Sequence, residues 1–460
     1  MMGMNSIVPI RNQIFSQLLT DYSFCLTSLE TTQRLCYWVT SLMGRVTLKN
    51  QNAVLLIATM DTKAQEVLYL LSCFETLGIP VLTLDGGMMG ESPFPVTIHR
   101  EKVALAGGMS LGEVRALGHE GKALAVMING AIQWAKDLYQ QGKIQGIIGL
   151  GGSMGTTLGT SVMRVLPIGF PKVMISSMAS RNTRAFVGTK DILMLHSVCD
   201  LSGINRITKK ILQNGALALA GMMREDFDYS LPTKPLNVVS TLGTIEPCAA
   251  KVRKNLESKG KEVVVFHTVG SGGEAMEEMI HEEEIEAVLD LSLNEIANHL
   301  FGGDYDAGPN RGSAALQRGI PTVLVPGNID FLATGPIQEA ERRFPGRIYH
   351  IHNAAITAVR TERTELEAVA QLLAHRCHAA RGPFSILVPL GGFSVFDHQG
   401  APFHDPEGPK IFGKTLERHL QPGASLHFLP YHINDPEFSE AVLRALEQLL
   451  EIKIKQDKRR

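Results

Sequence analysis

Short apolar runs alternate with amphipathic segments along most of the chain, starting near residue 52. Runs at 52–59, 79–85 and 144–150 have the length of buried strands, and the segments between them show the 3.6-residue apolar spacing of helices. One such helix is predicted to break near Gly118. Strands and helices that alternate in this way predict parallel sheets with connecting helices on both faces.

The second half of the chain starts with the same pattern as the first. A segment at 226–235 with two prolines and little apolar periodicity separates the halves. Beyond it, Thr241 and Gly260 stand 182 residues after Thr59 and Gly78, in similar surroundings. Internal duplication and chance likeness between two strand–helix–strand units both remain open. Further strands are predicted at 287–293, 321–328, 347–353, 384–394 and 425–433, and we expect the 347–353 run to continue the second sheet.

The predicted fold is therefore α/β, with two open Rossmann-like domains and mainly parallel sheets in tandem. The domains are expected at 43–228 and 236–455. Residues 1–42 have weak periodicity, and their apolar positions are too interrupted for a signal peptide. They are interpreted either as a poorly ordered leader or as an over-extended start, with Met43 as the true first residue.

Composition excludes several classes of protein. A chain of 460 residues is too long for one ordinary core. A formal net charge of −2 gives no broad electrostatic surface for nucleic acid or membrane. Six cysteines without a CxxC pair fit a reducing, cytoplasmic setting, and no apolar stretch reaches the roughly 20 residues of a membrane span.

The sequence GIIGLGGSMGTTLGT, residues 146–160, is the first candidate binding element. A strand leads into a helix through a cluster of small residues: Gly151, Gly152, Ser153, Gly155 and Thr156. Glycines allow a ligand to approach the backbone, and the helix start offers free N–H groups with partial positive charge. The loop is thus a candidate phosphate site, and a tight turn that binds nothing is the alternative.

Two standard nucleotide fingerprints do not fit this loop. A Walker-type loop needs Gly-Lys-Ser/Thr, which is absent here. The spacing of Gly149, Gly151 and Gly155 misses the dinucleotide pattern by one residue, and the next strand ends in serines instead of a ribose-binding acid. A nicotinamide site is therefore not expected.

A second candidate element, ATMDTK at 58–63, follows the first strand. Asp61 is a candidate Mg²⁺ ligand, while Thr62 and Lys63 are candidate phosphate contacts. An ordinary helix N-cap with a solvated lysine is the alternative. Because both elements end strands of one parallel sheet, we expect them to face the same crevice.

Residues 302–331 concentrate glycine and polar residues around two predicted strand ends. Arg311 has the planar fork that binds a carboxylate or phosphate through two hydrogen bonds, and Asn328 and Asp330 follow the next strand. These three residues are a candidate second ligand site, with plain turn chemistry as the alternative.

Four motifs in this order, IATMDTK, GLGGSMGTTLGT, MISSMASRN and DLSGINRI, resemble the ATP-binding family typified by the N-terminal half of the tomato mosaic virus resistance protein. Its bacterial and fungal members were long catalogued as an uncharacterised protein family. The resemblance covers most of 54–450. It implies ATP bound in the first domain, at 61–63 and 151–155, and a tendency to form homodimers. The plant C-terminal barrel domain has no counterpart in this sequence.

Three functions follow as hypotheses. The first is a Mg²⁺–ATP-binding protein with a small substrate in an interdomain cleft, and thus an ATP-dependent enzyme of unknown reaction. The second is a non-catalytic nucleotide sensor or dimeric scaffold. The third is an enzyme that acts on a phosphorylated sugar or acid. No convincing general base can be identified, so no catalytic residue is assigned.

Overall fold

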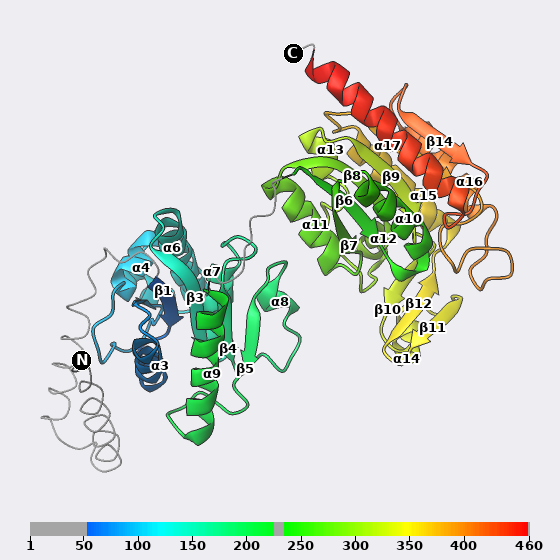
Figure 1. Ribbon diagram of the computed structural model, residues 1–460. Helices are drawn as coiled ribbons and strands as arrows, with labels where there is room; N and C mark the ends of the chain where they lie inside the picture. Colours follow the sequence, from blue (N-terminus) through cyan, green and yellow to red (C-terminus); the bar gives the residue numbers. More distant parts are fainter. Residues whose placement is uncertain (1–52, 225–233, 459–460) are drawn as a thin grey trace, which may run out of the picture. The chain divides into compact units, whose positions relative to one another are not determined.

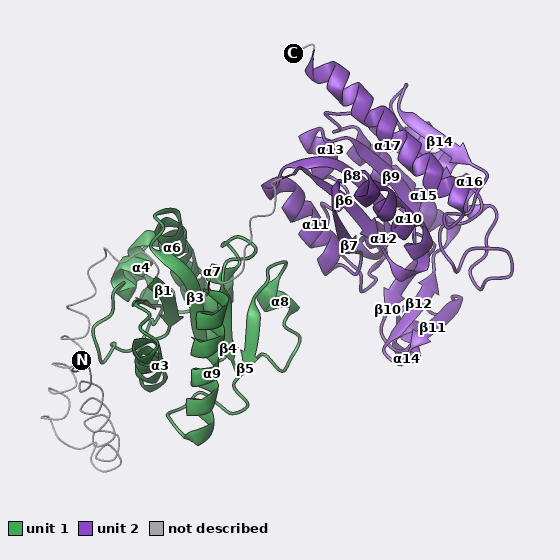
Figure 2. Cartoon of the chain, viewed as in Figure 1, with its two compact units in different colours: residues 1–228 green, residues 229–460 purple. Residues whose placement is uncertain are grey.

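The computed structural model describes residues 53–224 and 234–458, and the chain divides into two compact units, Met1–Asp228 and Tyr229–Arg460 (Figures 1 and 2). The sequence-based interpretations of residues 1–42 lie outside the described residues. None of the helices in the described ranges is long and apolar enough to cross a membrane.

Unit 1 is built on a five-stranded sheet in the order β2-β1-β3-β4-β5, with every pair parallel. Its strands are β1 (Ala53–Ala58), β2 (Val81–Asp85), β3 (Ile144–Gly151), β4 (Lys172–Ser176) and β5 (Leu193–His196). Its helices are α3 (Ala64–Thr76), α4 (Arg100–Ala106), α5 (Leu111–Ala116), α6 (Glu120–Gln140), α7 (Ser153–Met163), α8 (Arg184–Val187) and α9 (Arg206–Met222).

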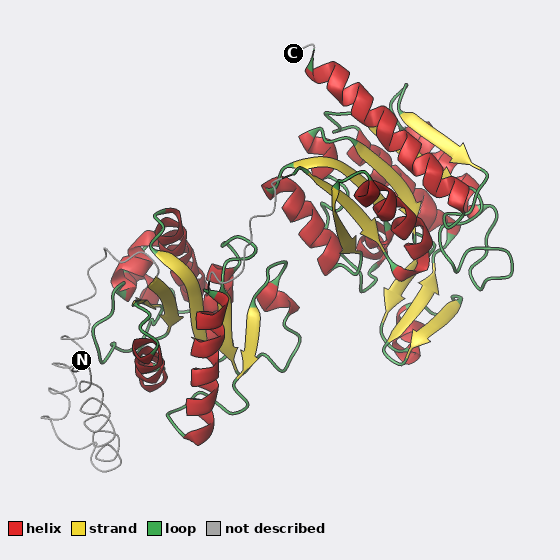
Figure 3. Cartoon of the chain, viewed as in Figure 1, coloured by secondary structure: helices red, strands yellow, loops and turns green. Residues whose placement is uncertain are grey.

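Alternate residues of the unit 1 strands point to opposite faces of the sheet. On β1, Leu55 and Ile57 pack with α4, α6 and α7, whereas Val54 and Leu56 pack with α3 and α9. Helices therefore cover both faces, as Figure 3 shows. The predicted break at Gly118 is confirmed, because this glycine has a φ of 60° between α5 and α6.

Unit 2 has a six-stranded parallel sheet in the order β14-β13-β9-β8-β6-β7. Its strands are β6 (Leu236–Thr241), β7 (Glu262–His267), β8 (Ile285–Ser292), β9 (Thr322–Gly327), β13 (Phe384–Pro389) and β14 (Ser425–Leu429). Its helices are α10 (Glu246–Ser258), α11 (Ser271–Glu282), α12 (Asn294–Phe301), α13 (Ala314–Arg318), α14 (Ile337–Arg343), α15 (Arg363–Cys377), α16 (Gly408–His419) and α17 (Pro436–Asp457).

One predicted strand of unit 2 belongs to a different sheet. We expected 347–353 to continue the large sheet, but β11 (Tyr349–Asn353) pairs antiparallel with β12 (Ile356–Arg360), which also pairs with β10 (Phe331–Thr334). These three strands form a small separate sheet. The His and Asn side chains of β11 are tolerated because this strand is largely exposed. A strand that is buried on both faces of a parallel sheet would not accommodate them.

The two units share one strand order. In unit 1 the order is 2-1-3-4-5, and the first five strands of the large sheet in unit 2 repeat it. Helices α3 and α10 both have 13 residues, and their bounds differ by the same 182 positions as Thr59 and Thr241. The predicted α/β architecture with mainly parallel sheets is confirmed.

Candidate functional site

The loops after β1 and β3 lie side by side at the carboxyl edge of the unit 1 sheet. Strands β1 and β3 are hydrogen-bonded neighbours, with Ile57 opposite Gly149. The chain leaves β1 through α3 on one face and leaves β3 through α7 on the other. Open α/β sheets bind ligands at such a switch point, because the diverging helices leave a crevice between the two loops.

The start of α7 is shaped for close approach to its backbone. Gly152 is the N-cap, and the first helical hydrogen bond runs from Thr156 N to Gly152 O at 2.8 Å. The N–H groups before Thr156 have no acceptor inside the helix. A Cβ on Gly151 would lie 2.8 Å from Gly155 Cα, so this turn requires glycine. At Gly152, by contrast, the nearest described atom to such a Cβ is Ser177 Oγ at 3.9 Å. Beside it Ser153 is exposed.

Thr156 lies behind the loop instead of in front of it. Its side chain is fully buried, and its hydroxyl contacts Gly152 O at 2.7 Å and Ser176 Oγ at 2.6 Å. It was predicted to contact the nucleotide, but these contacts tie the helix start to the end of β4. Thr156 therefore positions the loop.

Asp61 holds the loop that follows β2. Its Oδ2 accepts hydrogen bonds from Met89 N and Gly90 N, both at 3.1 Å. Its Oδ1 is buried and has no hydrogen-bond partner among the described residues. A Cβ on Gly87 would lie 2.9 Å from both Asp61 Oδ1 and Asp85 Oδ1, so only glycine fits between these two carboxylates.

Thr62 and Lys63 also make contacts within unit 1. Thr62 Oγ1 and Thr59 Oγ1 are 2.7 Å apart, and Lys63 Nζ donates a hydrogen bond to Leu201 O. Leu201 lies in the loop after β5, and this loop has a second contact at Gly203, whose N–H donates to the buried Glu66 carboxylate at 2.6 Å. The 59–66 segment thus supports the loops after both β2 and β5.

All four motifs on which the family resemblance rests meet at one edge of this sheet. The motif that contains Asp61 follows β1, and the motif that contains Gly152 follows β3. The motif that contains Ser176 lies at the end of β4, and the motif that contains Leu201 lies before α9. Hydrogen bonds join the first motif to the fourth, through Lys63 and Leu201, and the second to the third, through Thr156 and Ser176. Segments that are far apart in the sequence are therefore held together in two pairs at this edge.

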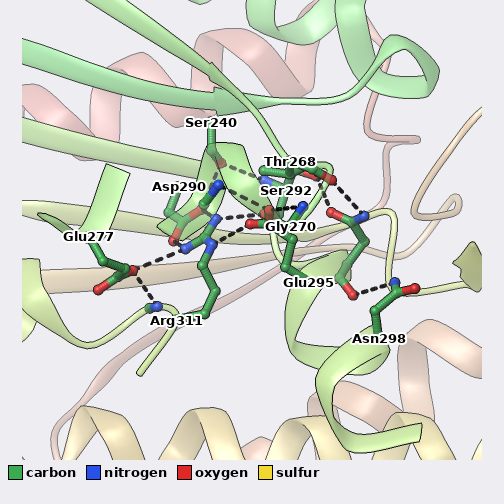
Figure 4. A network of polar contacts seen from close by, with 12 residues as sticks. Ser240, Thr268, Gly270, Glu277, Asp290, Ser292, Glu295, Asn298 and Arg311 are labelled. Carbon is green, nitrogen blue, oxygen red and sulfur yellow. Dashed lines mark hydrogen bonds and ion pairs between the residues drawn. The ribbon is translucent and has the colours of Figure 1, made fainter. Parts of the chain in front are cut away.

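Arg311 in unit 2 is not available to an external ligand. Its side chain is fully buried, and it forms two parallel hydrogen bonds with Asp290, at 2.6 and 2.7 Å (Figure 4). Its remaining donors reach Glu295, Glu277 and the carbonyl of Ser292. The bidentate carboxylate partner predicted for Arg311 exists, but the chain itself supplies it.

This buried network fixes the charge states of its members. Burial opposes the charge of Arg311, yet Asp290 and Glu295 hold its pKa well above the usual range. Burial raises the pKa of the Glu295 carboxyl, and Arg311 opposes that rise. Glu295 also accepts hydrogen bonds from Gly270 N and Gly273 N at the start of α11 (Figure 4). The network is a structural centre of unit 2.

Asn328 and Asp330 are both buried, and Asn328 joins this network at Ser292, whereas Asp330 contacts Ser394. Asn328 donates to Ser292 Oγ at 2.8 Å and accepts from Thr244 Oγ1. Asp330 Oδ2 accepts from Ser394 Oγ at 2.6 Å, while Oδ1 has no partner in the described part of the chain. Among the described residues, neither has a hydrogen bond to Arg311, although Arg311 and Asn328 share Ser292 as a partner.

Two family models match the chain in succession. The N-terminal domain of the uncharacterised protein family UPF0261 matches residues 52–228, and the C-terminal domain of that family matches residues 234–450. The chain belongs to the UPF0261 family. The family relationship expected from the four motifs is thus confirmed, while ATP binding stays a prediction.

Relatives of this UPF0261 chain occur in bacteria and in a plant. A UPF0261 protein of Clostridium tetani is 35% identical over 399 residues, which cover 86% of this chain and 99% of that protein. One from Mesorhizobium japonicum is 32% identical over 86% of this chain and 98% of its own length. The ToMV resistance protein Tm-1 of Solanum lycopersicum is 34% identical over 330 residues, which are 70% of this chain and 44% of that protein.

Solved structures resemble the UPF0261 chain only distantly. MurG of Acinetobacter baumannii is 12% identical, covers 87% of this chain and all of its own, and has a TM-score of 0.22. A putative UDP-N-acetylglucosamine 2-epimerase of Listeria monocytogenes is 10% identical over 60% of this chain and 79% of its own, with a TM-score of 0.20. Likeness at this level carries no argument about ligand or reaction.

Asp85 and Arg100 are candidate site residues of the UPF0261 chain that the sequence reasoning missed. Asp85 ends β2 beside β1, and it accepts hydrogen bonds from Met60 N at 3.0 Å and Gly87 N at 2.8 Å. Burial raises its pKa, against the effect of these bonds and of Arg100. The available signal was an acidic residue at the last position of an apolar strand, directly before Gly-Gly.

Proposed function

We propose that unit 1 of this UPF0261 protein binds a nucleotide, and specifically ATP, at the switch point between β1 and β3. The observation that carries the proposal is the start of α7, where Gly152 leaves open space beside backbone N–H groups that lack helical acceptors. A helix of 11 residues directs partial positive charge to this point, and phosphate is the anion for which such loops are most used.

The neighbouring loop supplies further groups of the right chemistry. Lys63 brings a positive charge to the same sheet edge, and the exposed hydroxyls of Thr62 and Ser153 are donors for phosphate oxygens. The ammonium of Lys63 contacts Leu201 O, so a phosphate would have to share or replace that carbonyl. The preference for ATP over other nucleotides rests on the family resemblance alone.

Magnesium fits this proposal through Asp61. Within the described residues, no group of three or more His, Cys, Asp or Glu side chains could hold a metal ion. Mg²⁺, however, needs only one or two carboxylates when phosphate oxygens and water complete its octahedron. Asp61 Oδ1, buried and without a hydrogen-bond partner, is the oxygen assigned to it. The ion would neutralise phosphate charge there.

The test is calorimetric titration of the full chain with ATP, ADP, NAD and a sugar phosphate, each with and without Mg²⁺. We expect saturable binding of ATP, and we expect Gly152→Asp to abolish it because a carboxylate would stand among the N–H groups. The matched control is Gly221→Asp in α9, where a side chain meets no described atom within 4 Å. Unchanged ATP affinity in folded Gly152→Asp protein would refute this placement.

The same titrations separate the alternative functions. Heat for a sugar phosphate without heat for ATP would favour an enzyme that acts on a phosphorylated sugar or acid. If ATP binds, release of ADP in the presence of small acids would indicate an ATP-dependent enzyme. Binding without turnover would favour a nucleotide sensor or scaffold, and light scattering with and without ATP would test the expected homodimer.

A further inference from the structure

Unit 1 contains a polar cavity of about 210 Å³ beyond the end of β2. It is lined by Asp85, Glu91, Ser92, His99, Arg100 and Glu101. The wall therefore comes from the last residue of β2, the irregular segment that follows it, and the first turn of α4. Neither the four family motifs nor the proposed nucleotide loops include any of these residues.

Arg100 is the unusual member of this wall. It is 94% buried, since only 6% of its surface is exposed. Its Nε contacts the neighbouring Glu101 Oε1 at 3.4 Å, which is a long bond to a half-exposed carboxylate. Its Nη1 is buried and has no hydrogen-bond partner in the described part of the chain.

An unpaired buried guanidinium nitrogen is costly. Leaving a charged donor unsatisfied typically costs more than the about 1–3 kcal/mol of a neutral group. Buried arginines are therefore paired, as Arg311 of unit 2 is, with all five of its donors used. Arg376 of unit 2 is equally buried and also has an Nη1 without a partner among the described residues, so an unpaired donor alone does not indicate a ligand. Arg100 differs because its side chain also lines a cavity, and the two observations together indicate a ligand that supplies the acceptor.

The other lining residues restrict the chemistry of that ligand. The carboxylates of Asp85, Glu91 and Glu101 outnumber the single guanidinium in the lining, so a dianion such as phosphate would be repelled more strongly than a singly charged acid or a zwitterion. These same carboxylates accept hydrogen bonds from a hydroxyl or an ammonium group. The volume is below the roughly 300–1,000 Å³ of sites for drug-sized ligands, so the ligand has few atoms.

We propose that the cavity beside Arg100 binds a small monocarboxylic acid that carries a hydroxyl or amino group. The acid's carboxylate pairs with the Arg100 guanidinium, and its hydroxyl or ammonium group donates to Asp85 or Glu91. The planar fork of arginine suits a carboxylate, which has two acceptor oxygens in one plane.

This site is distinct from the proposed nucleotide site but adjoins it. Asp85 Oδ1 and Asp61 Oδ1 each lie 2.9 Å from the position of a Cβ on Gly87, so the cavity wall and the β1 loop meet at that glycine. The acid site does not depend on nucleotide binding. Its test is made in the absence of nucleotide, so either proposal can fail alone.

The experiment is calorimetric titration of the full chain with lactate, alanine, acetate and inorganic phosphate. We expect saturable binding of lactate or alanine and about ten-fold weaker binding of acetate, which lacks the second polar group. In Arg100→Met, affinity for the bound acid should fall at least about ten-fold, because the charged partner is lost. Arg253→Met, which removes a partly exposed arginine on α10, should leave affinity unchanged.

Each other outcome overturns the proposal. These outcomes are wild-type protein that binds neither lactate nor alanine at millimolar concentration, tighter binding of phosphate than of both acids, and unchanged affinity in folded Arg100→Met protein. If Arg100→Met does not fold, Arg100→Lys takes its place. Lysine keeps the charge but not the fork, so affinity must then fall, and equal affinity would contradict the assigned pairing.

Discussion

Arg311 and Asp290 face each other through two parallel hydrogen bonds in the interior of unit 2, with Nη1–Oδ2 and Nη2–Oδ1 distances of 2.6 and 2.7 Å. Asp290 is a strand residue of β8, and Arg311 belongs to the segment before α13. The pair therefore fastens a long connection to the centre of the sheet. Since both side chains are almost completely buried, neither has water as a substitute partner.

Arg311→Met should be strongly destabilising. The change leaves Asp290 and Glu295 as buried carboxylates without their cation, which typically costs about 3–5 kcal/mol. Urea unfolding followed by circular dichroism measures this loss. The control Arg253→Met, at a partly exposed arginine on α10, should shift stability by no more than about 0.5 kcal/mol. Similar losses in both variants would contradict the buried network.

Two helical glycines of unit 1 should respond oppositely to alanine. A Cβ on Gly130 of α6 would lie 1.8 Å from Val103 O of α4, so Gly130→Ala forces these helices apart and should cost about 1–3 kcal/mol. Gly221 of α9 meets no described atom within 4 Å, and Gly221→Ala should be neutral or stabilise by up to about 1 kcal/mol. Thermal unfolding of the two variants and of the wild type measures these effects. A melting temperature of Gly130→Ala above that of the wild type would be incompatible with the packing of α6 against α4.

Stability should depend on pH through Asp330. Burial raises its pKa to about 8, and Asp397 adds to the rise. Between the ordinary aspartate pKa of about 4 and this value, the folded state keeps a proton that the unfolded state has released, so stability falls as pH rises through this window. Burial also raises the pKa of Asp397, to about 6, which acts in the same direction over a narrower range.

Asp330→Asn should reduce this dependence, because an amide cannot ionise but its oxygen still accepts the Ser394 hydroxyl. The measurement is the free energy of unfolding in urea at about pH 5 and about pH 9. We expect a smaller difference between the two pH values in the variant than in the wild type. Equal differences would mean that Asp330 ionises normally in the folded protein.

The variant Asp61→Asn distinguishes two roles of Asp61, which are to hold the loop after β2 and, as we propose, to bind Mg²⁺. The amide oxygen can still accept from Met89 N or Gly90 N, so the fold should persist. The negative charge is lost, and Mg²⁺ should no longer strengthen ATP binding, a loss of about ten-fold or more in the metal-dependent gain. Calorimetry with and without Mg²⁺ measures it, with the exposed Asp137→Asn as control. If Mg²⁺ strengthens ATP binding in Asp61→Asn as much as in the wild type, Asp61 is not a ligand of the metal.

The central strands of the sheets could be predicted from sequence because they are short, mainly apolar runs. Ala53–Ala58 is buried throughout and Ile144–Gly151 at every position except Gln145, so an apolar run was a sufficient signal. The positions of Gly152 and Asp61 at one sheet edge followed in turn, since parallel strands end on the same side. The strand Tyr349–Asn353 was misassigned because apolar runs do not specify which sheet a strand joins.

The partners of polar side chains could not be predicted in the same way. Arg311 was predicted to bind a carboxylate or phosphate through two hydrogen bonds, but its acceptor Asp290 lies 21 residues away, within β8. The orientation of Arg100 depends on the irregular segment between β2 and α4, whose path no periodicity describes. Burial decides whether a charged residue serves a ligand or the fold, and this depends on tertiary packing.

Glu295 gives the second unit a different relation to ligands from the first. Its carboxylate already accepts hydrogen bonds from the N–H groups of Gly270 and Gly273 at the start of α11, whereas among the described residues the start of α7 in unit 1 has no side-chain cap hydrogen bond. An external anion at the start of α11 would have to compete with the Glu295 carboxylate. Because this carboxylate belongs to the same chain, its effective concentration at the N–H groups is set by the fold and does not depend on the protein concentration. At the start of α11 in unit 2 the anion is thus part of the chain itself, whereas the phosphate that we propose for the start of α7 in unit 1 would come from solution.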